Sequence, residues 1–301
     1  MKALRPAMMA GALTVMMTAS GNANLLIIGN GIGGKVPVTD GETLWSLVGG
    51  VQTSTTAGYN AKNAILRNYI VATSTTGAHT TFSLGEIDPF FGGTNGAPYI
   101  AVSGGVYTLI DPNPGASGRD IGNLKSLQVI AAPASKGTGG GQSAKVNLSG
   151  NVINPGAYTL SDLKNDFAPA QTTWSGVTYA GVSFFNFVNA SRTSDITGQI
   201  VVTTATDGYV VTLSLAELDP SLGGNPNDLL AYAATNTDFP ANGVARLVFP
   251  NDNRRGRWNS NLDFVSVGAA VPEPSTWAMM LLGLGVLGFA GRRRAKASVA
   301  A

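Results

Sequence analysis

The sequence has no cysteine, one histidine and little charge. Of its 301 residues, Asp, Glu, Lys and Arg make up 12%. The missing cysteine excludes disulfide bonds, thiolate zinc sites, iron–sulfur clusters and a cysteine nucleophile. The lone His79 has no paired base or nucleophile, so we interpret it as a packed or surface residue and expect no catalytic triad. A net charge of +2 without a basic stripe does not favour a nucleic-acid partner.

Hydrophobic residues make up 44% of the composition, and glycine is abundant with 39 copies. The chain is therefore apolar enough to bury a core. Its surface must be covered by Ser, Thr, Asn and Gly rather than by ions. This balance is typical of a strand-rich protein outside the cytoplasm.

The N-terminus has the three parts of a secretory signal. Lys2 and Arg5 supply positive charge, an apolar run follows over 7–19, and Gly21 and Ala23 provide small residues before a cleavage site. We predict a signal peptide over 1–23, removed by signal peptidase after Ala23. The alternative is a retained membrane anchor, for which the apolar run is short.

The C-terminus combines three different elements in a fixed order. Pro272, Glu273 and Pro274 precede the uncharged apolar stretch 277–291, which ends at Arg292, Arg293 and Arg294. The stretch predicts a membrane helix, and the arginines would stay cytoplasmic and hold the body outside. An ordinary C-terminal anchor is the alternative.

Residues 271–296 resemble the PEP-CTERM sorting signal of Gram-negative bacteria. The resemblance implies processing by an exosortase after tethering to the inner membrane. It further implies a final place at the cell surface or in the extracellular biofilm matrix, with exopolysaccharide as a possible partner.

The body of the chain contains an internal repeat. Residues 65–98 align with 196–229 without a gap at an offset of 131, and 105–129 align with 243–267. Upstream, 41–48 parallels 181–188. This period exceeds that of a solenoid and predicts two homologous domains, 24–132 and 146–268. The Gly/Ser-rich segment 133–145 between them is expected to be a flexible linker.

Strand patterns dominate each repeat. In the second repeat, 200–204 and 209–215 flank the turn dipeptide Asp207-Gly208 and predict a hairpin. Further strands are expected over 245–249 and 264–267, and short helices over 160–164, with Ser161 as N-cap, and 182–188. The predicted fold class is α+β and strand-rich.

Several motifs follow one another in the second repeat: the opening segment 150–160, the turn 207–209, the segments 215–220 and 246–250, and Gly256-Arg257-Trp258. Their order resembles the molybdopterin-binding domain of the sulfite-oxidase superfamily, more weakly so in the first repeat. The resemblance implies two tandem copies of that fold. It also implies that Arg257 and Arg255, with Arg119 in the first repeat, bind the anionic pterin.

The missing cysteine is a departure from that family, whose active members bind molybdenum through one. Ser175 lies near the corresponding region, but a hydroxyl is a poor ligand for this metal. We therefore expect a fold kept without its redox chemistry: a non-catalytic binding or structural protein of the envelope or matrix, with no catalytic residue, metal or cofactor. The alternative is a molybdopterin-binding oxidoreductase or an accessory protein of a redox system.

Three further patterns have competing interpretations. Residues 29–35 match G-x-G-x-x-G, but Val36 and Pro37 follow where a helix would begin, so we expect a turn or a flexible start rather than a nucleotide site. The repeated Glu-x-Asp-Pro, at Glu86 and Glu217, predicts a structural corner, with calcium or substrate binding as the alternative. The segment 254–258 is either a solvated loop or an anion site whose exposed Trp258 could stack on sugar rings.

Overall fold

The computed structural model describes residues 24–29, 32–48, 64–92, 97–113, 115–190, 195–235, 237–239 and 243–270. The predicted signal peptide with Ala23 lies outside these residues. The predicted sorting signal, with Pro272, Glu273, Pro274 and Arg292 to Arg294, also lies outside them.

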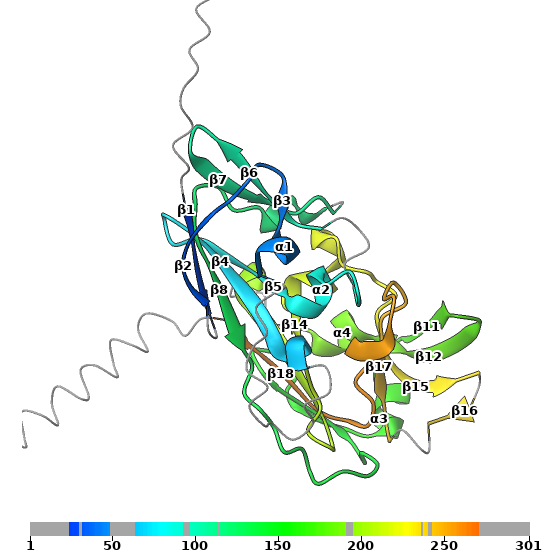
Figure 1. The fold of residues 1–301 in the computed structure, drawn as a ribbon. Helices are drawn as coiled ribbons and strands as arrows, with labels where there is room; N and C mark the ends of the chain where they lie inside the picture. Colours follow the sequence, from blue (N-terminus) through cyan, green and yellow to red (C-terminus); the bar gives the residue numbers. More distant parts are fainter. Residues whose placement is uncertain are drawn as a thin grey trace, which may run out of the picture.

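Strands dominate the described residues and the helices are short, which confirms a strand-rich α+β fold (Figure 1). The α-helices are α1 Leu44–Val48, α2 Leu84–Ile87, α3 Leu160–Asn165, α4 Phe184–Val188 and α5 Leu215–Leu218. The 3-10 helices are η1 Ala64–Arg67, η2 Ala116–Arg119, η3 Ile196–Gly198, η4 Pro220–Leu222 and η6 Arg255–Arg257. Within the described ranges, no helix combines the length and the hydropathy needed to cross a membrane.

Two of the three five-stranded sheets form the centre of the molecule. The first has the order β2-β1-β8-β4-β5, built from β1 Asn24–Gly29, β2 Ile32–Pro37, β4 Asn68–Ser74, β5 His79–Ser83 and β8 Leu124–Ala131. The second has the order β10-β9-β18-β13-β14, built from β9 Val146–Gly150, β10 Gly156–Tyr158, β13 Gln199–Ala205, β14 Val210–Ser214 and β18 Leu262–Ala269. The predicted hairpin over 200–215 is confirmed as β13 and β14.

A three-stranded sheet and a third five-stranded sheet accompany them. One consists of β3 Glu42–Thr43, β6 Tyr99–Ser103 and β7 Val106–Ile110. The other consists of β11 Pro169–Trp174, β12 Val177–Ser183, β15 Leu229–Ala234 and β16 Thr237–Asp238, with β17 Arg246–Val248 also pairing with β15. The hairpin of β11 and β12 projects from one end of the molecule (Figure 1).

The two central sheets, β2-β1-β8-β4-β5 and β10-β9-β18-β13-β14, correspond strand by strand. Each contains one parallel pair, β1 with β8 and β9 with β18. Each has a register shift at equivalent positions, between Thr73 and Ser74 and between Thr204 and Ala205. The hairpin of β1 and β2 occupies the place that β9 and β10 take in the second sheet. The two halves therefore share one strand order in their central sheets.

The hydrophobic residues form one large core in each half. In the first half, alternate strand residues such as Leu25, Ile70 and Leu127 are fully buried, as the two-residue period of a strand requires. A third, smaller cluster, comprising Tyr69, Val71, Ile200 and Ala270, joins β4 to β13 across the two halves. The halves therefore pack directly against one another along β4, β5, β13 and β14.

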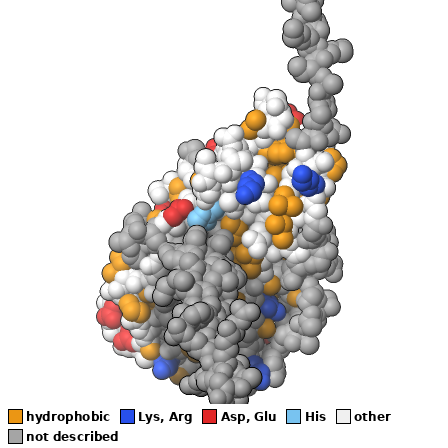
Figure 2. Space-filling model, turned by 90° about the vertical axis from the view of Figure 1, so that its left-hand side faces the viewer, with side chains coloured by type: hydrophobic (Ala, Val, Ile, Leu, Met, Phe, Trp, Pro, Cys, Tyr) orange, Lys and Arg blue, Asp and Glu red, His pale blue; other side chains and the backbone are white. Residues whose placement is uncertain are grey.

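One face of the molecule shows charged side chains scattered singly among hydrophobic and uncharged polar ones (Figure 2). This is the appearance expected from a composition with 12% charged residues. Part of this face is covered by residues that are not described.

Local details correct four sequence-based expectations. Helix α3 is capped by Thr159, in a capping box with Asp162, rather than by Ser161. The segment 182–188 is not wholly helical, because α4 begins at Phe184 and Ser183 is its N-cap. Of the strand expected over 245–249, residues 246–248 form β17, and the strand expected over 264–267 extends to 262–269 as β18. Strands β1 and β2 pair antiparallel with Gly29 opposite Ile32, in keeping with the turn interpretation.

The segment between the halves is hydrogen-bonded to the second half, although its composition predicts a flexible linker. The backbone N–H groups of Thr138, Gly139 and Gly140 all donate to the carbonyl oxygen of Thr206, at 2.9, 3.1 and 2.8 Å. Gly137, Gly139 and Gly140 adopt positive φ, which lets the chain wrap around one acceptor. The glycines therefore allow this segment to pack closely against the second half, rather than making it mobile.

Candidate functional site

The repeated Ser-Leu-x-Glu sequence forms the same capping box in both halves. Ser83 caps α2 and Glu86 closes the box, while Ser214 and Glu217 do the same for α5. In each box the serine hydroxyl accepts from the glutamate backbone N–H, and the glutamate carboxylate accepts from the serine N–H. This arrangement satisfies backbone donors that a helix start leaves unpaired.

The two capping boxes also bind each other across the interface between the halves. The hydroxyl of Ser83 donates to Glu217 Oε1 at 3.0 Å. Reciprocally, the hydroxyl of Ser214 donates to Glu86 Oε2 at 3.0 Å. Each carboxylate thus completes its own helix cap and accepts a hydrogen bond from the other half, which gives the interface an approximate two-fold symmetry.

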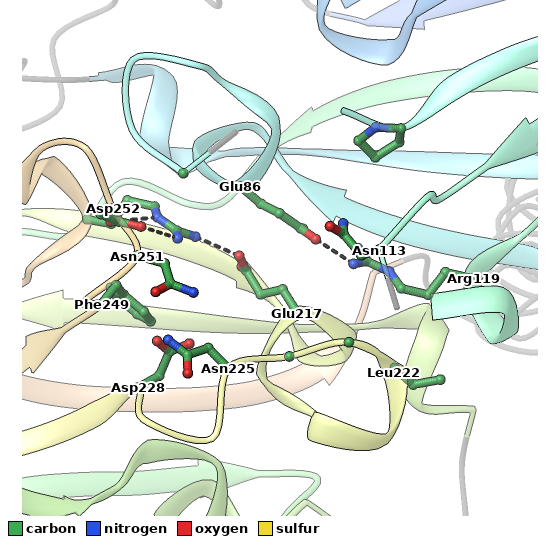
Figure 3. A pocket seen from close by; sticks show the side chains of 15 residues that line it. Glu86, Asn113, Arg119, Glu217, Leu222, Asn225, Asp228, Phe249, Asn251 and Asp252 are labelled. Atoms are coloured by element: carbon green, nitrogen blue, oxygen red, sulfur yellow. Dashed lines mark hydrogen bonds and ion pairs between the residues drawn. The ribbon is translucent and has the colours of Figure 1, made fainter. Parts of the chain in front are cut away.

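An arginine from each half completes the cluster (Figure 3). Arg119 Nη1 lies 2.5 Å from Glu86 Oε1 and 3.1 Å from Asp111 Oδ2. Arg257 Nη1 lies 2.6 Å from Glu217 Oε2. Its Nε and Nη2 atoms donate to the two oxygens of Asp252, at 3.0 and 2.5 Å. The side chains of both arginines are almost completely buried, with 2% and 8% of their surface exposed.

No sequence pattern indicated the two aspartates of this cluster, Asp111 and Asp252. The repeat alignment pairs Asp111 with Phe249, so the carboxylates that meet the two arginines do not occupy equivalent positions. The repeated Ser-x-x-Glu sequence, typical of a capping box, is the pattern that could have placed Glu86 and Glu217 at helix starts.

Glycines allow the arginine side chain to cross the interface. A Cβ at Gly85 would lie 2.7 Å from Arg257 Cδ, and one at Gly92 would lie 2.8 Å from Arg257 Nη2. Two further glycines, at equivalent positions of the repeat, also have close neighbours. Gly256 packs on the ring of Phe91, and Gly118 packs on Leu222.

A cavity of about 270 Å³ opens next to the cluster. Beyond the ion-paired residues, its lining includes Asp228, Asn225, Asn113, Asn251 and Phe249 (Figure 3). Asp228 is buried, with 8% of its surface exposed. Two arginines and five carboxylates therefore meet here, and the carboxylates outnumber the cations.

Burial and crowding raise the pKa values of most of these acids. Desolvation, reinforced by the charge of Glu86, raises the pKa of Glu217 to about 7. Desolvation also raises the pKa values of Asp111, Asp252 and, most strongly, Asp228. For Arg257, burial alone would lower the pKa, but Asp252 and Glu217 raise it well above its usual range, so its charge is permanent.

These shifts predict that the protein is more stable in mild acid than in mild base. Because the native state holds the protons of Glu217 and the three aspartates more tightly than the unfolded chain, stability falls as pH rises from their ordinary values toward 7. Thermal unfolding followed by circular dichroism should give a higher midpoint at about pH 5 than at about pH 8.

The variant Glu217→Gln should flatten this pH dependence. Asp162→Asn is the control, because the pKa of that exposed carboxyl is lowered by hydrogen bonds from Thr159, and it stays ionised across this range. A wild-type midpoint that rises from pH 5 to pH 8 would contradict the assignment.

The structure separates the three arginines that the family resemblance assigns to the pterin. Arg119 and Arg257 lie in the buried cluster, whereas Arg255 is exposed on η6 with its guanidinium 4.4 Å from the ring of Trp174. Trp258 is only 4% exposed, so the expectation of an exposed stacking residue is wrong. The indole of Trp258 packs against the rings of Trp174 and Tyr179, and this contact buries it.

Other candidate residues have local roles. Ser175 is exposed in the tight turn between β11 and β12, with a φ of 49°. Asp88 and Asp219 end the short helices α2 and α5. His79 begins β5. Among the described residues, no three His, Cys, Asp or Glu side chains are grouped so that they could hold a metal ion.

Comparison with known families gives a match at the C-terminal end. Residues 270–294 match the PEP-CTERM protein-sorting motif. A search of curated proteins finds no match to this chain. The match confirms the predicted sorting signal and covers none of the strands described above. The chain is therefore a protein that carries a signal for sorting by an exosortase system.

Proposed function

We propose that this protein is a non-catalytic binding or structural module of the cell envelope or extracellular matrix. The supporting observation is that the side chains of Arg119 and Arg257 are buried and ion-paired. Both guanidinium groups, which the family resemblance would assign to an anionic cofactor, are buried and paired with two carboxylates each.

A pterin phosphate would have to displace these carboxylates to reach either arginine. Breaking a buried ion pair leaves an uncompensated charge and costs several kcal/mol, on the order of 3–5. These ion pairs lie within each half, and they favour a structural role in which the arginines stabilise the two halves beside their interface, where Arg119 Nη2 also donates to Ser214 Oγ at 3.3 Å. The two halves would then be degenerate copies of a sulfite-oxidase-like domain, kept for their shape.

The proposed function includes export, tethering to a membrane and processing. The body is exported after removal of residues 1–23 and is held at the inner membrane by the C-terminal helix. An exosortase then processes it for the cell surface or the extracellular matrix. At that location we expect the protein to be surrounded by exopolysaccharide. The PEP-CTERM match supports the sorting step of this route.

Metal analysis of protein purified from the producing cell tests the absence of redox chemistry. We expect no stoichiometric molybdenum and no fluorescent pterin after oxidation, because the cysteine ligand is missing and the arginines are occupied. Intact mass is the control that the analysed material is the exported form, beginning near Asn24. Molybdenum at one atom per chain would overturn the proposal in favour of the alternative, a molybdopterin-binding oxidoreductase or accessory protein.

A further inference from the structure

A second cavity, of about 420 Å³, lies wholly within the second half. The residues that line it come from the turn before β14, from β17, and from η6 with the segment that follows it. They are Ala205, Asp207, Tyr209, Arg246, Arg255, Gly256, Trp258, Asn259, Ser260 and Asn261. No residue of the ion-paired cluster belongs to this lining.

Two arginines of this cavity have unused hydrogen-bonding capacity. Within the described part of the chain, the side chain of Arg255 makes no hydrogen bond or ion pair, and it lies against the rings of Trp174 and Trp258, at 4.4 and 5.3 Å. Arg246 donates through Nη2 to Ser260 Oγ at 2.6 Å, while its buried Nε has no partner among the described residues. A guanidinium offers five donors, so most of them are open here.

The electrostatics of the two arginines differ from those of Arg119 and Arg257. Burial and the charge of Arg255 together lower the pKa of Arg246. The pair therefore repel each other, whereas the arginines of the interface are each neutralised by carboxylates. Asp207 is the one carboxylate among the lining residues, and its Oδ1 already accepts from the backbone N–H of Tyr209. The lining thus carries a net charge of one positive unit, which a monoanion would balance.

We propose that this cavity binds a small organic carboxylate carried on a hydroxylated ring, such as a sugar acid. A carboxylate matches the planar fork of a guanidinium, and one negative charge balances the lining. The volume exceeds that of a bare carboxylate, and the remaining lining offers the polar groups of Ser260, Asn259 and Asn261 beside two aromatic residues. Such a mixture suits hydroxyl groups on a ring. This site is independent of the proposed structural role of Arg119 and Arg257.

Isothermal titration of the full-length chain with D-glucuronate at low salt tests the proposal. Arg255→Gln and Arg246→Gln should each weaken binding at least about tenfold, since a hydrogen bond to a charged group contributes that much or more. Arg254→Gln is the matched control. Arg254 is the neighbouring exposed arginine, stacked on Phe90 at 3.9 Å outside the cavity, and its loss should leave affinity unchanged.

Competing ligands make the test decisive. D-glucose should not bind, because it lacks the charge, and acetate should bind more weakly, because it lacks the ring. Equal binding of glucose, tighter binding of inorganic phosphate, or no binding of glucuronate would overturn the proposal. So would equal affinity of acetate and glucuronate, or wild-type affinity in Arg255→Gln, an exposed position whose substitution should leave the fold intact. Molybdenum content is a separate readout, so failure here leaves the proposed function standing.

Discussion

Replacing Arg257 with glutamine is expected to lower the free energy of unfolding by about 3–5 kcal/mol. The side chain pairs with Glu217 and Asp252, and its charge also acts on Asp228. All three carboxylates are buried, so they would keep their desolvation penalty and lose the cation that offsets it. Glutamine retains some of the packing but supplies no charge.

Urea unfolding of the full chain, followed by circular dichroism, measures this loss. Arg254→Gln, which removes an exposed arginine three positions away, is the control and should change stability by less than about 0.5 kcal/mol. The loss in Arg257→Gln should also shrink at about pH 5, because the stranded carboxylates can then take up protons. A loss below about 1 kcal/mol at neutral pH would mean that these buried ion pairs contribute no more to stability than exposed ones do.

The second prediction uses two glycines at equivalent positions of the repeat. Gly256→Ala should destabilise the protein by about 1–3 kcal/mol, as expected for an overpacked core. The new methyl group would lie 2.1 Å from Phe91 Cε1, and the Phe91 ring is only 4% exposed. The backbone has little freedom to move away, because the carbonyl of Gly256 accepts from the hydroxyl of Tyr209 at 2.6 Å.

Gly118→Ala is the matched comparison in the other half. Its methyl group would meet Leu222 Cδ2 at 2.8 Å, which is the end of a flexible side chain that can rotate away. Alanine also restricts the unfolded chain, a gain of about 0.4–1 kcal/mol that should make this substitution nearly neutral. Thermal and urea unfolding of both variants would show the difference. Equal losses at the two positions would show that the packing around Phe91 adapts as easily as that around Leu222.

Local and repetitive features were predictable from the sequence. The hairpin of β13 and β14 follows from β-branched strands around Asp207-Gly208, a signal contained in fifteen or so consecutive residues. The corresponding strand order of the two sheets follows the offset seen in the alignment. The sorting signal was recognisable because its three unlike elements are contiguous, and the family match confirms it.

Features that depend on packing between distant segments were not predictable. The composition of 133–145 suggested a flexible linker, yet the glycines wrap around the carbonyl of Thr206, a contact that no local pattern encodes. Burial of Trp258 likewise depends on Trp174, which lies on the separate hairpin of β11 and β12. Three of the five residues of 254–258 are arginines, and the structure alone divides them into a buried Arg257 and the exposed Arg254 and Arg255.

The amino-acid sequence by itself determined the strand-rich class, the repeat and the sorting signal, because each rests on neighbouring residues or on self-similarity. The tertiary structure alone decided which charges meet. Ser83 and Glu217 are 134 residues apart, and Asp111 and Asp252 occupy positions that the repeat does not relate. The hydrogen bond between Ser83 and Glu217 depends on how the two halves pack, whereas each aspartate meets the arginine of its own half. Burial makes a carboxylate require a cation, and only the folded chain brings one within reach.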